Sequence, residues 1–352
     1  MTTLPSEMKA ARFHEVNEPL RIENVPVPDV EEDEVLVRTR AVGLCGSDLH
    51  IVFEGVTPTA FTPITLGHEP SGEVARTGAR VEGWEEGDRV TVDPVLFCGS
   101  CRNCITGHTE ICLTRRLIGI QAEGALAEYV AVPAKNLVRL PENVPFTVGA
   151  IITDAIATPF HALVDRAALK VGESVAIYGA GGLGLHAVQL ARLLGAARIF
   201  VVEPRAEQLE RAKRLGADVT INPEDSPPVE AILEATDGLG VDVAVDFVGL
   251  EQTVAQAVES TVRGGRAVVV GLGPEDIRTV SPTIFVRDQI SLLGSYAFTK
   301  RNVEQLVDLT ASGRLDLEDS ITHTFPLEEV NKGLEYLHEK IENPIRVAIT
   351  LS

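Results

Sequence analysis

Residues 174–184 read SVAIYGAGGLG, a short apolar run followed at once by a loop that contains four glycines. Such a run is typical of a parallel strand covered on both faces, and the apolar residues of 183–194 recur at helical spacing. A G-x-G-x-x-G loop between such a strand and such a helix is the fingerprint of dinucleotide binding. Gly179 permits the tight turn, Gly181 lets the backbone approach a pyrophosphate, and Gly184 allows close packing of the helix on the strand. The sequence therefore predicts a Rossmann domain here.

Strand and helix patterns alternate around this loop, from about residue 156 to residue 297. The charged stretch 206–215 has the apolar spacing of an amphipathic helix. The predicted strands after the glycine loop are 199–202, 219–221, 241–247, 266–270 and 289–293. This alternation predicts a doubly wound sheet of parallel strands, so we assign residues 156–297 to an α/β dinucleotide-binding domain.

An acidic residue, Glu203, ends the next strand, 19 residues after Gly184. At that place a carboxylate accepts hydrogen bonds from the adenosine ribose hydroxyls and repels a 2′-phosphate, which favours NAD over NADP. The alternative is a solvent-exposed acid at a strand end. Arg205 leaves NADP open, because a guanidinium can pair with a 2′-phosphate or stack on adenine. The predicted cofactor-binding residues of this domain are Gly179, Gly181, Gly182, Leu183, Gly184, Glu203 and Arg205.

The residues on either side of the Rossmann pattern belong to a different kind of domain. From residue 9 to about residue 138, short strands that alternate at period two, such as 34–42, are broken by glycine, proline and aspartate. We predict an antiparallel, barrel-like β region there. The tail from residue 301 returns to a helix and terminal strands. The sequence therefore predicts one discontinuous β-rich domain, residues 1–155 and 298–352.

Four of the five cysteines, in the pattern C-x2-C-x2-C-x7-C, lie in a predicted lobe of about residues 94–115. Four convergent thiolates make a closed tetrahedral zinc site that leaves no position for a substrate. The ligands of this predicted structural zinc are Cys98, Cys101, Cys104 and Cys112. The alternative is a pair of disulfides in a secreted protein. We disfavour it because no secretory signal precedes Met8 and because gaps of two residues strain a disulfide.

The overall charge narrows the choice of partners. The 352 residues include 51 acidic and 31 basic side chains, a formal net charge of −20. Such a charge repels nucleic-acid phosphates and anionic membranes, so neither is expected as a partner. No run approaches the ~20 apolar residues of a membrane span, and cysteines with metal roles available favour a reducing cytoplasm. A salt-adapted source and a GC-rich genome would both give this composition, and the sequence does not separate them.

Three further motifs accompany the cysteine lobe and the glycine loop: GLCGSDLH at 43–50, GHEP at 67–70 and IITDAIAT at 151–158. Together, over about residues 8–349, they resemble the zinc-containing medium-chain alcohol dehydrogenases, in particular the bacterial secondary-alcohol and polyol branch. The resemblance implies that the discontinuous domain is a GroES-like catalytic domain and that the enzyme is a homodimer or homotetramer. The implied reaction transfers a hydride between a primary or secondary alcohol and NAD(P)+, with a zinc-bound alkoxide and a Ser/His proton relay.

The resemblance also implies a second, catalytic zinc, which needs three protein ligands and one open position. Its ligands would be Cys45, His68 and Asp154. Taken alone, such a cysteine is usually a small hydrophobe and such a histidine a satisfied surface or core residue, and Asp154 would be a helix N-terminal acid. Glu69 is the alternative: it enters the coordination sphere transiently or hydrogen-bonds beside the metal.

Ser47 and His50 complete the implied active site. In the family the hydroxyl takes the proton of the alcohol, which passes through the nicotinamide ribose to the histidine and then to water. A spacing of three suits one turn of helix after Cys45, whereas Ser47 alone would be interpreted as an N-cap. Thr158 matches a position that flanks the nicotinamide ring. Arg346 matches an arginine near the pyrophosphate, although an exposed arginine on an edge strand is common.

The sequence does not decide between several classes of substrate. The same motifs resemble polyol, 2,3-butanediol and threonine-type dehydrogenases, which more often carry glutamate at the third-ligand position, so Asp154 favours simple or secondary alcohols. A zinc- and nucleotide-binding protein of this fold without turnover is a remote alternative, which would have no need of an open metal site. The sequence does not identify the alcohol, nor does it decide between a dimer and a tetramer.

Overall fold

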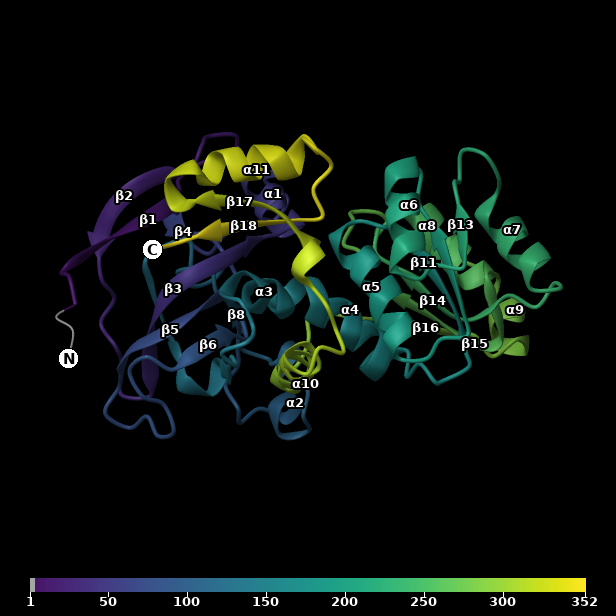
Figure 1. Ribbon diagram of the computed structural model, residues 1–352. Coiled ribbons are helices and arrows are strands. Elements are labelled where there is room, and N and C mark those ends of the chain that lie inside the picture. Colours follow the sequence, from purple (N-terminus) through teal and green to yellow (C-terminus); the bar gives the residue numbers. More distant parts are fainter. Residues whose placement is uncertain (1–3) are drawn as a thin grey trace. The chain divides into compact units, whose positions relative to one another are not determined.

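In the computed structural model, which describes residues 4–352, the chain forms two compact units (Figure 1). The first unit ends at Asp154 and resumes with Thr299–Ser352, so it is built from two separate parts of the chain. The second unit is Ala155–Phe298. The predicted fold class, a discontinuous β-rich domain with a doubly wound parallel sheet, is confirmed.

A seven-stranded sheet forms the centre of the first unit. Its strand β3 (Glu34–Leu44) lies between β5 (Glu69–Thr77) and β18 (Arg346–Thr350) and pairs antiparallel with both. The other strands of this sheet are β6 (Arg89–Val92), β9 (Tyr129–Pro133), β10 (Leu137–Arg139) and β17 (Ile321–Pro326). Because β18 is near the C-terminal end, the purple and yellow parts of the chain meet in one sheet (Figure 1).

Apolar side chains on this sheet form the main core of the first unit. Val37, Leu44 and Ile349 are fully buried there, and burial of each such side chain contributes roughly 1.5–3 kcal/mol. The smaller sheets consist of β1 (Glu7–Phe13), β2 (Arg21–Pro26) and β4 (Ile64–Thr65), and of β7 (Val95–Leu96) and β8 (Arg116–Leu117). The α-helices are α1 (Gly46–Leu49), α2 (Arg102–Ile105), α3 (Phe146–Ile151), α10 (Lys300–Ala311) and α11 (Val330–His338). The shorter helical turns are η1 (His50–Glu54), η2 (Thr109–Ile111), η3 (Ala134–Asn136), η6 (Glu318–Ser320) and η7 (Leu327–Glu329).

The second unit is built on one parallel sheet. Its strand order is β13-β12-β11-β14-β15-β16, which is the order 3-2-1-4-5-6 of the Rossmann fold. The strands are β11 (Ser174–Tyr178), β12 (Arg198–Val202), β13 (Val219–Ile221), β14 (Val241–Asp246), β15 (Thr261–Val269) and β16 (Ser291–Gly294). The helices are α4 (Ala157–His161), η5 (Ala162–Arg166), α5 (Gly182–Leu193), α6 (Ala206–Leu215), α7 (Pro228–Ala235), α8 (Glu251–Glu259) and α9 (Pro282–Arg287).

The glycine loop connects β11 to α5. Gly179 has a φ of 88°, which favours glycine. A Cβ on Gly184 would lie 1.8 Å from the carbonyl oxygen of Gly179, so no side chain fits where helix and strand meet. A Cβ on Gly181 would have no heavy atom within 4 Å. The chain therefore requires glycine at 184 for packing, and the open side of Gly181 leaves room for a ligand.

One helical stretch, Phe146–Arg166, is long and apolar enough to cross a membrane, but 83% of its apolar window is buried inside the protein. It is a core element and not a continuous helix. Within η4 (Ile152–Ile156), Thr153 and Asp154 leave the helical conformation. Asp154 has φ 71° and ψ −70°, a rare and strained γ-turn for a residue with a side chain. The interpretation of Asp154 as an ordinary helix N-terminal acid is therefore wrong.

Candidate active site and zinc-binding lobe

Cys45 is fixed at the point where β3 gives way to α1. Its backbone is extended, with φ −116° and ψ 162°, and it is the N-cap of α1. The Oδ2 atom of Asp48 accepts a hydrogen bond from the Cys45 N–H at 2.8 Å. Both side chains are buried. Ser47 lies inside α1, so its interpretation as the N-cap is wrong.

His68 lies immediately before β5 and is 3% exposed. Its Nε2 is 3.1 Å from the hydroxyl of Ser47 and 3.6 Å from Oδ2 of Asp154. Its Nδ1 is 3.6 Å from Oδ1 of Asp48, a distance too long for a good hydrogen bond. The imidazole is thus surrounded by acids and a hydroxyl.

The third side chain of this cluster reaches it from the strained turn after α3. Oδ2 of Asp154 lies 3.1 Å from Sγ of Cys45. One potential ligand atom from each of Cys45, His68, Glu69 and Asp154 lies within 4.8 Å of all the others. The structure therefore brings together the four residues for which the sequence predicted a catalytic zinc.

Burial and negative charge dominate the electrostatics of this cluster. Burial raises the pKa of the Cys45 thiol, and the nearby Asp154 raises it further. Burial by itself would lower the pKa of His68, but Asp48, Asp154 and Cys45 together raise it well above its ordinary value. Burial also raises the pKa of Asp48. A concentration of acidic groups around one imidazole favours a bound cation.

Glu69 has a partner of its own in Arg346. Nη2 of Arg346 donates hydrogen bonds to both carboxylate oxygens, and the two side chains are 4% and 0% exposed. Burial raises the pKa of Glu69 to about 7 in spite of the guanidinium beside it. Burial would lower the pKa of Arg346, but Glu69 and Cys45 keep it above its ordinary value. The pair is therefore part of the electrostatic surroundings of the cluster formed by Cys45, His68 and Asp154.

This ion pair spans β3, which separates the strands that carry the two residues. Gly43 of β3 is paired with Glu69 on one side and Ala348 on the other. A Cβ on Gly43 would lie 2.0 Å from Oε2 of Glu69. The missing side chain of Gly43 makes room for the carboxylate. The alternative of an exposed edge-strand arginine is wrong, because β18 lies between β3 and β17 and Arg346 is buried.

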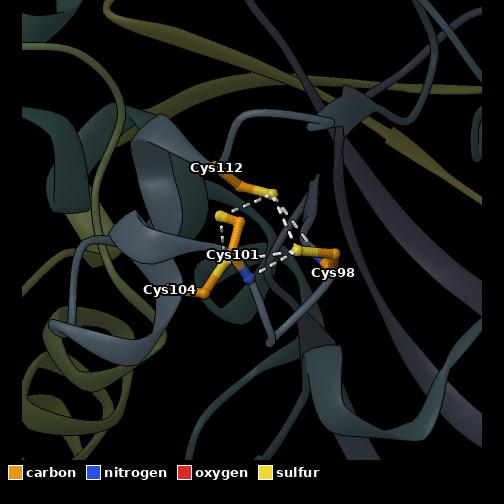
Figure 2. Close-up of side chains that lie close together, drawn as sticks. All are labelled: Cys98, Cys101, Cys104 and Cys112. Atoms are coloured by element: carbon orange, nitrogen blue, oxygen red, sulfur yellow. Dashed lines mark hydrogen bonds between the residues drawn. The ribbon is translucent and has the colours of Figure 1, made fainter.

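The four other cysteines converge in the lobe around α2 and η2 (Figure 2). Their Sγ–Sγ separations are 3.5 Å for Cys101–Cys104, 3.6 Å for Cys98–Cys112, and 3.9 Å for Cys98–Cys104 and Cys101–Cys112. Zinc–sulfur bonds of ~2.3 Å in a tetrahedron place sulfur atoms about 3.8 Å apart. All four cysteines are free of disulfides, so the two-disulfide alternative is wrong.

The thiol chemistry of this lobe also suits a cation. The backbone N–H groups of Ser100 and Cys101 donate to Sγ of Cys98 at 3.4 and 3.3 Å. They lower the pKa of Cys98 to about 5. Burial raises the pKa of Cys104 to about 12. A backbone hydrogen bond from Leu113 also lowers the pKa of Cys101. Two acidic thiols would give zinc its first ligands, and a bound zinc would favour deprotonation of the others.

Glu203 connects the end of β12 to the glycine loop. It is 4% exposed, so its interpretation as a solvent-exposed acid is wrong. The Ala180 N–H donates to its Oε2 at 2.8 Å, and Nε of Arg205 donates to its Oε1 at 2.7 Å. Thr158, which the sequence also predicted to contact the cofactor, is buried in α4.

Comparison with known proteins gives the family. The protein-family model for the alcohol dehydrogenase GroES-like domain matches residues 31–142 of the sequence. The protein-family model for zinc-binding dehydrogenases matches residues 182–312. The chain is 32% identical over 336 residues to sorbitol dehydrogenase of Bacillus subtilis strain 168, covering 95% of this chain and 94% of that protein. The chain belongs to the zinc-containing medium-chain alcohol dehydrogenases.

Other relatives of this dehydrogenase are named for different substrates. L-Threonine 3-dehydrogenase of Caldanaerobacter subterraneus subsp. tengcongensis is 35% identical over 318 residues, which are 88% of this chain and 90% of that protein. The solved alcohol dehydrogenase of Thermus sp. ATN1 is similar with a TM-score of 0.90 and 30% identity, over 98% of this chain and 100% of that chain.

The protein is therefore an oxidoreductase of EC 1.1.1 type that uses zinc and NAD(P), with the activity of a zinc-type alcohol or polyol dehydrogenase. The side chains present fit these cofactors. The sulfur separations of the lobe match a tetrahedral zinc, and Cys45, His68 and Asp154 offer a thiol, an imidazole and a carboxylate. The Asp48 carboxylate lies 3.6 Å from Nδ1 of His68, so it adds negative charge beside the imidazole without a good hydrogen bond to it.

Some contacts of this dehydrogenase were missed in the sequence. Asp48, three residues after Cys45, could have been found as an acid positioned to accept the N–H of a helix N-cap. Glu54, four residues after His50, could have been found from its helical spacing. The partnership of Glu69 with Arg346 gives no local signal, because 277 residues separate the two positions.

The ion pair predicts unequal effects of two substitutions. Glu69→Gln should lower the free energy of unfolding by about 3–5 kcal/mol, because it leaves a buried guanidinium without its counter-charge. Arg346→Met should lower it less, because the Glu69 carboxyl, whose pKa burial already raises to about 7, can take up a proton. Urea unfolding at pH 6, followed by circular dichroism, measures both.

The double variant Glu69→Gln/Arg346→Met is the control. It removes both charges and should be more stable than Glu69→Gln alone. Equal losses in the two single variants, or a double variant no more stable than Glu69→Gln, would show that the pair contributes nothing specific.

Proposed function

We propose that Cys45, His68 and Asp154 hold the catalytic zinc of this dehydrogenase. The observation that supports this is the convergence of their ligand atoms within 4.8 Å in a buried, acid-rich cluster. Glu69 is the fourth member, but Arg346 already binds both of its carboxylate oxygens, so Asp154 is the better third ligand. When bound in such a site, zinc supplies Lewis acidity toward the oxygen of the substrate.

Ser47 and His50 are the proposed proton relay. The hydroxyl of Ser47 lies 3.1 Å from Nε2 of His68, so it is placed beside the proposed metal ligands. There it would accept the proton that the alcohol loses on oxidation and give up its own hydroxyl hydrogen toward His50, so that the serine stays neutral. The side chain of His50 is 40% exposed and can release a proton to water.

The substrate class we propose is simple primary or secondary alcohols. The support is Asp154, the smaller acid at the third-ligand position. Polyols and threonine form the second candidate class, favoured by the relatives named sorbitol dehydrogenase and L-threonine 3-dehydrogenase. Parallel assays of aliphatic and aromatic alcohols, polyols and L-threonine, each with NAD+ and NADP+, test the choice. The highest kcat/KM for a polyol or for threonine would reject the simple-alcohol proposal.

NAD is the proposed cofactor, because the buried carboxylate of Glu203 lies at the end of β12, where the ribose hydroxyls bind in Rossmann folds. Pairing with Arg205 compensates part of its charge. The ring contact of Thr158 and the pyrophosphate contact of Arg346 stay predictions. We also place the enzyme in the cytoplasm, since a reducing compartment keeps four adjacent thiols available for zinc.

A homodimer formed through β16 is the proposed assembly. β16 is the last strand in its sheet and, among the described strands, pairs only with β15. Leu292 of β16 and Phe285 of the neighbouring helix α9 pack against one apolar cluster, formed by Val258, Ala267 and Ile290. Ile284 and Val286 of α9 are 46% and 70% exposed. Antiparallel pairing of two β16 strands about a two-fold axis would satisfy the strand edge and cover these side chains.

The ligand assignment predicts the behaviour of Asp154→Asn. Asparagine tolerates the positive φ of this position, so the variant should fold, while it replaces an anionic ligand by a neutral amide. We expect zinc content to fall towards one ion per chain and kcat to fall by more than about 100-fold. Metal analysis measures the zinc content. NADH titration is the control for folding, since the affinity for NADH should be unchanged. Two retained zinc ions with normal turnover would return the third-ligand role to Glu69.

Cofactor preference should depend on the charge of Glu203. Glu203→Gln keeps an oxygen that can accept the Ala180 N–H but loses the repulsion of a 2′-phosphate. The ratio of kcat/KM for NADP+ to that for NAD+ should rise about tenfold, equivalent to about 1.4 kcal/mol. Adding Arg205→Ala should reverse most of the gain. A wild-type enzyme that already prefers NADP+ contradicts the assignment.

The assembly through β16 predicts a monomer when charge is placed beside that strand. Val286→Glu should shift sedimentation from dimer to monomer, because the interface would bury an unpaired carboxylate. Leu239→Glu is the matched control: Leu239 is also 70% exposed but follows α7. A dimer that withstands Val286→Glu, or dissociates with Leu239→Glu, places the interface elsewhere.

A further inference from the structure

His50 has a carboxylate partner that the activity described above does not use. Its Nδ1 lies 2.8 Å from Oε2 of Glu54. The two residues are the first and last of η1, which is a single π-helical turn. π-Helical turns are frequent at functional sites, although η5 is another such turn in this protein, so the case for Glu54 depends on its contact with His50.

The backbone of η1 is held firmly, although its two charged ends reach solvent. The carbonyl of His50 accepts hydrogen bonds from the N–H groups of Gly55 and Val56. Ile51 and Val52 are 1% and 2% exposed. Glu54 is therefore presented to His50 by a buried segment and not by a mobile loop.

Two neighbouring contacts fix the turn from outside. The ring of Phe53 stacks on that of His338 of α11, with centroids 4.4 Å apart and an interplanar angle of 18°. The Asn17 N–H donates to the carbonyl of Val52 at 2.7 Å. Gly55 ends the turn with a φ of 66°, and a Cβ there would approach Val16 at 3.2 Å. The spacing of His50 and Glu54 is thus set by the fold.

The contact selects one form of the His50 ring. A carboxylate only accepts hydrogen bonds, so the hydrogen of neutral His50 lies on Nδ1. The lone pair then lies on Nε2, and this atom is the one that can accept a proton. The side chains are 40% and 46% exposed, so the pair adds little to stability. Its consequence is the orientation and tautomer of the imidazole.

We propose that Glu54 is a positioning residue of the proton relay and holds His50 in the Nε2-accepting tautomer. The proposal rests on the proposed relay role of His50. The relayed proton binds Nε2 and gives an imidazolium whose Nδ1–H still donates to Glu54. Nε2–H then gives its proton to water, and Glu54 itself never becomes protonated. The same pairing of an imidazole with an orienting carboxylate serves general-base histidines elsewhere.

Four variants of the full-length zinc enzyme test the proposal: Glu54→Ala, Glu54→Gln, His50→Gln and the double variant His50→Gln/Glu54→Ala. Glu54→Ala should lower kcat for alcohol oxidation about fivefold to tenfold with KM unchanged, a part of the ~10²–10⁴ that acid–base groups contribute. Glu54→Gln should recover most of this rate, because its amide oxygen also accepts Nδ1–H. In the His50→Gln background Glu54→Ala should have no further effect.

The imidazole itself supplies a second measurement. Long-range 1H–15N NMR of the histidine rings should show Nδ1–H for His50 in the wild type and in Glu54→Gln, and a mixture of tautomers in Glu54→Ala. Glu304→Ala is the matched control, since Glu304 is also an exposed i,i+4 partner, of Lys300. It should leave both kcat and the His50 signals unchanged.

The outcomes separate this inference from the proposed function. If His50→Gln slows turnover but Glu54→Ala does not, the relay stands and the role of Glu54 is overturned. If Glu54→Ala slows His50→Gln as much as it slows wild type, its effect is structural and the proposal is again overturned. If His50→Gln itself has no effect, the relay fails, and the inference fails with it.

Discussion

A buried guanidinium is the constraint around which the first unit is arranged. Arginine cannot lose its proton in a protein, so Arg346, at 4% exposure, requires a fixed anion beside it. Glu69 supplies that anion from β5, and β3 lies between the two strands. Because Arg346 and Glu69 must meet across β3, the intervening residue is Gly43, which has no side chain to block them. The same contact accounts for β18 lying next to β3. The two distant parts of the chain that form this unit are therefore held together by the Glu69–Arg346 ion pair as well as by strand pairing.

The same ion pair also fixes part of the proposed metal site. Glu69 starts β5 directly after His68, so the arginine that holds Glu69 also fixes the backbone that presents the imidazole. Cys45 follows β3 in the same way, with Asp48 holding its N–H. The cluster is built on the ends of adjacent strands, and rigid strand ends hold ligands more precisely than loops do. Only Asp154 reaches the cluster from a turn, and that turn is strained.

Much of this architecture could be predicted from the sequence, because its signals are local. The apolar run before Gly179 and the alternation that follows it are sufficient for the Rossmann fold, and the motifs around Cys45 and His68 are sufficient to group the residues of the proposed metal site. Prediction from local sequence patterns was incomplete where residues distant in the sequence determine the structure. β15 begins at Thr261, five residues before the predicted start, because Thr261 already pairs with Val241 of β14, whereas the pairing with β16 starts at Arg266. The strained backbone of Asp154 likewise has no sequence signature.

The position of Asp154 bears on how such enzymes can exchange parts. It is the last residue of the first unit, and the peptide bond after it begins the second. A recombination event that replaces the nucleotide-binding module must therefore join the new segment next to the proposed third metal ligand, whose carboxylate depends on a strained turn. Modules that do not continue this turn would displace the ligand without changing its identity. The opposite junction, at Thr299 before α10, carries no such requirement, since Thr299 is an ordinary helix cap. Exchange of cofactor modules in evolution or in the laboratory is thus limited by one of the two crossover points far more than by the other.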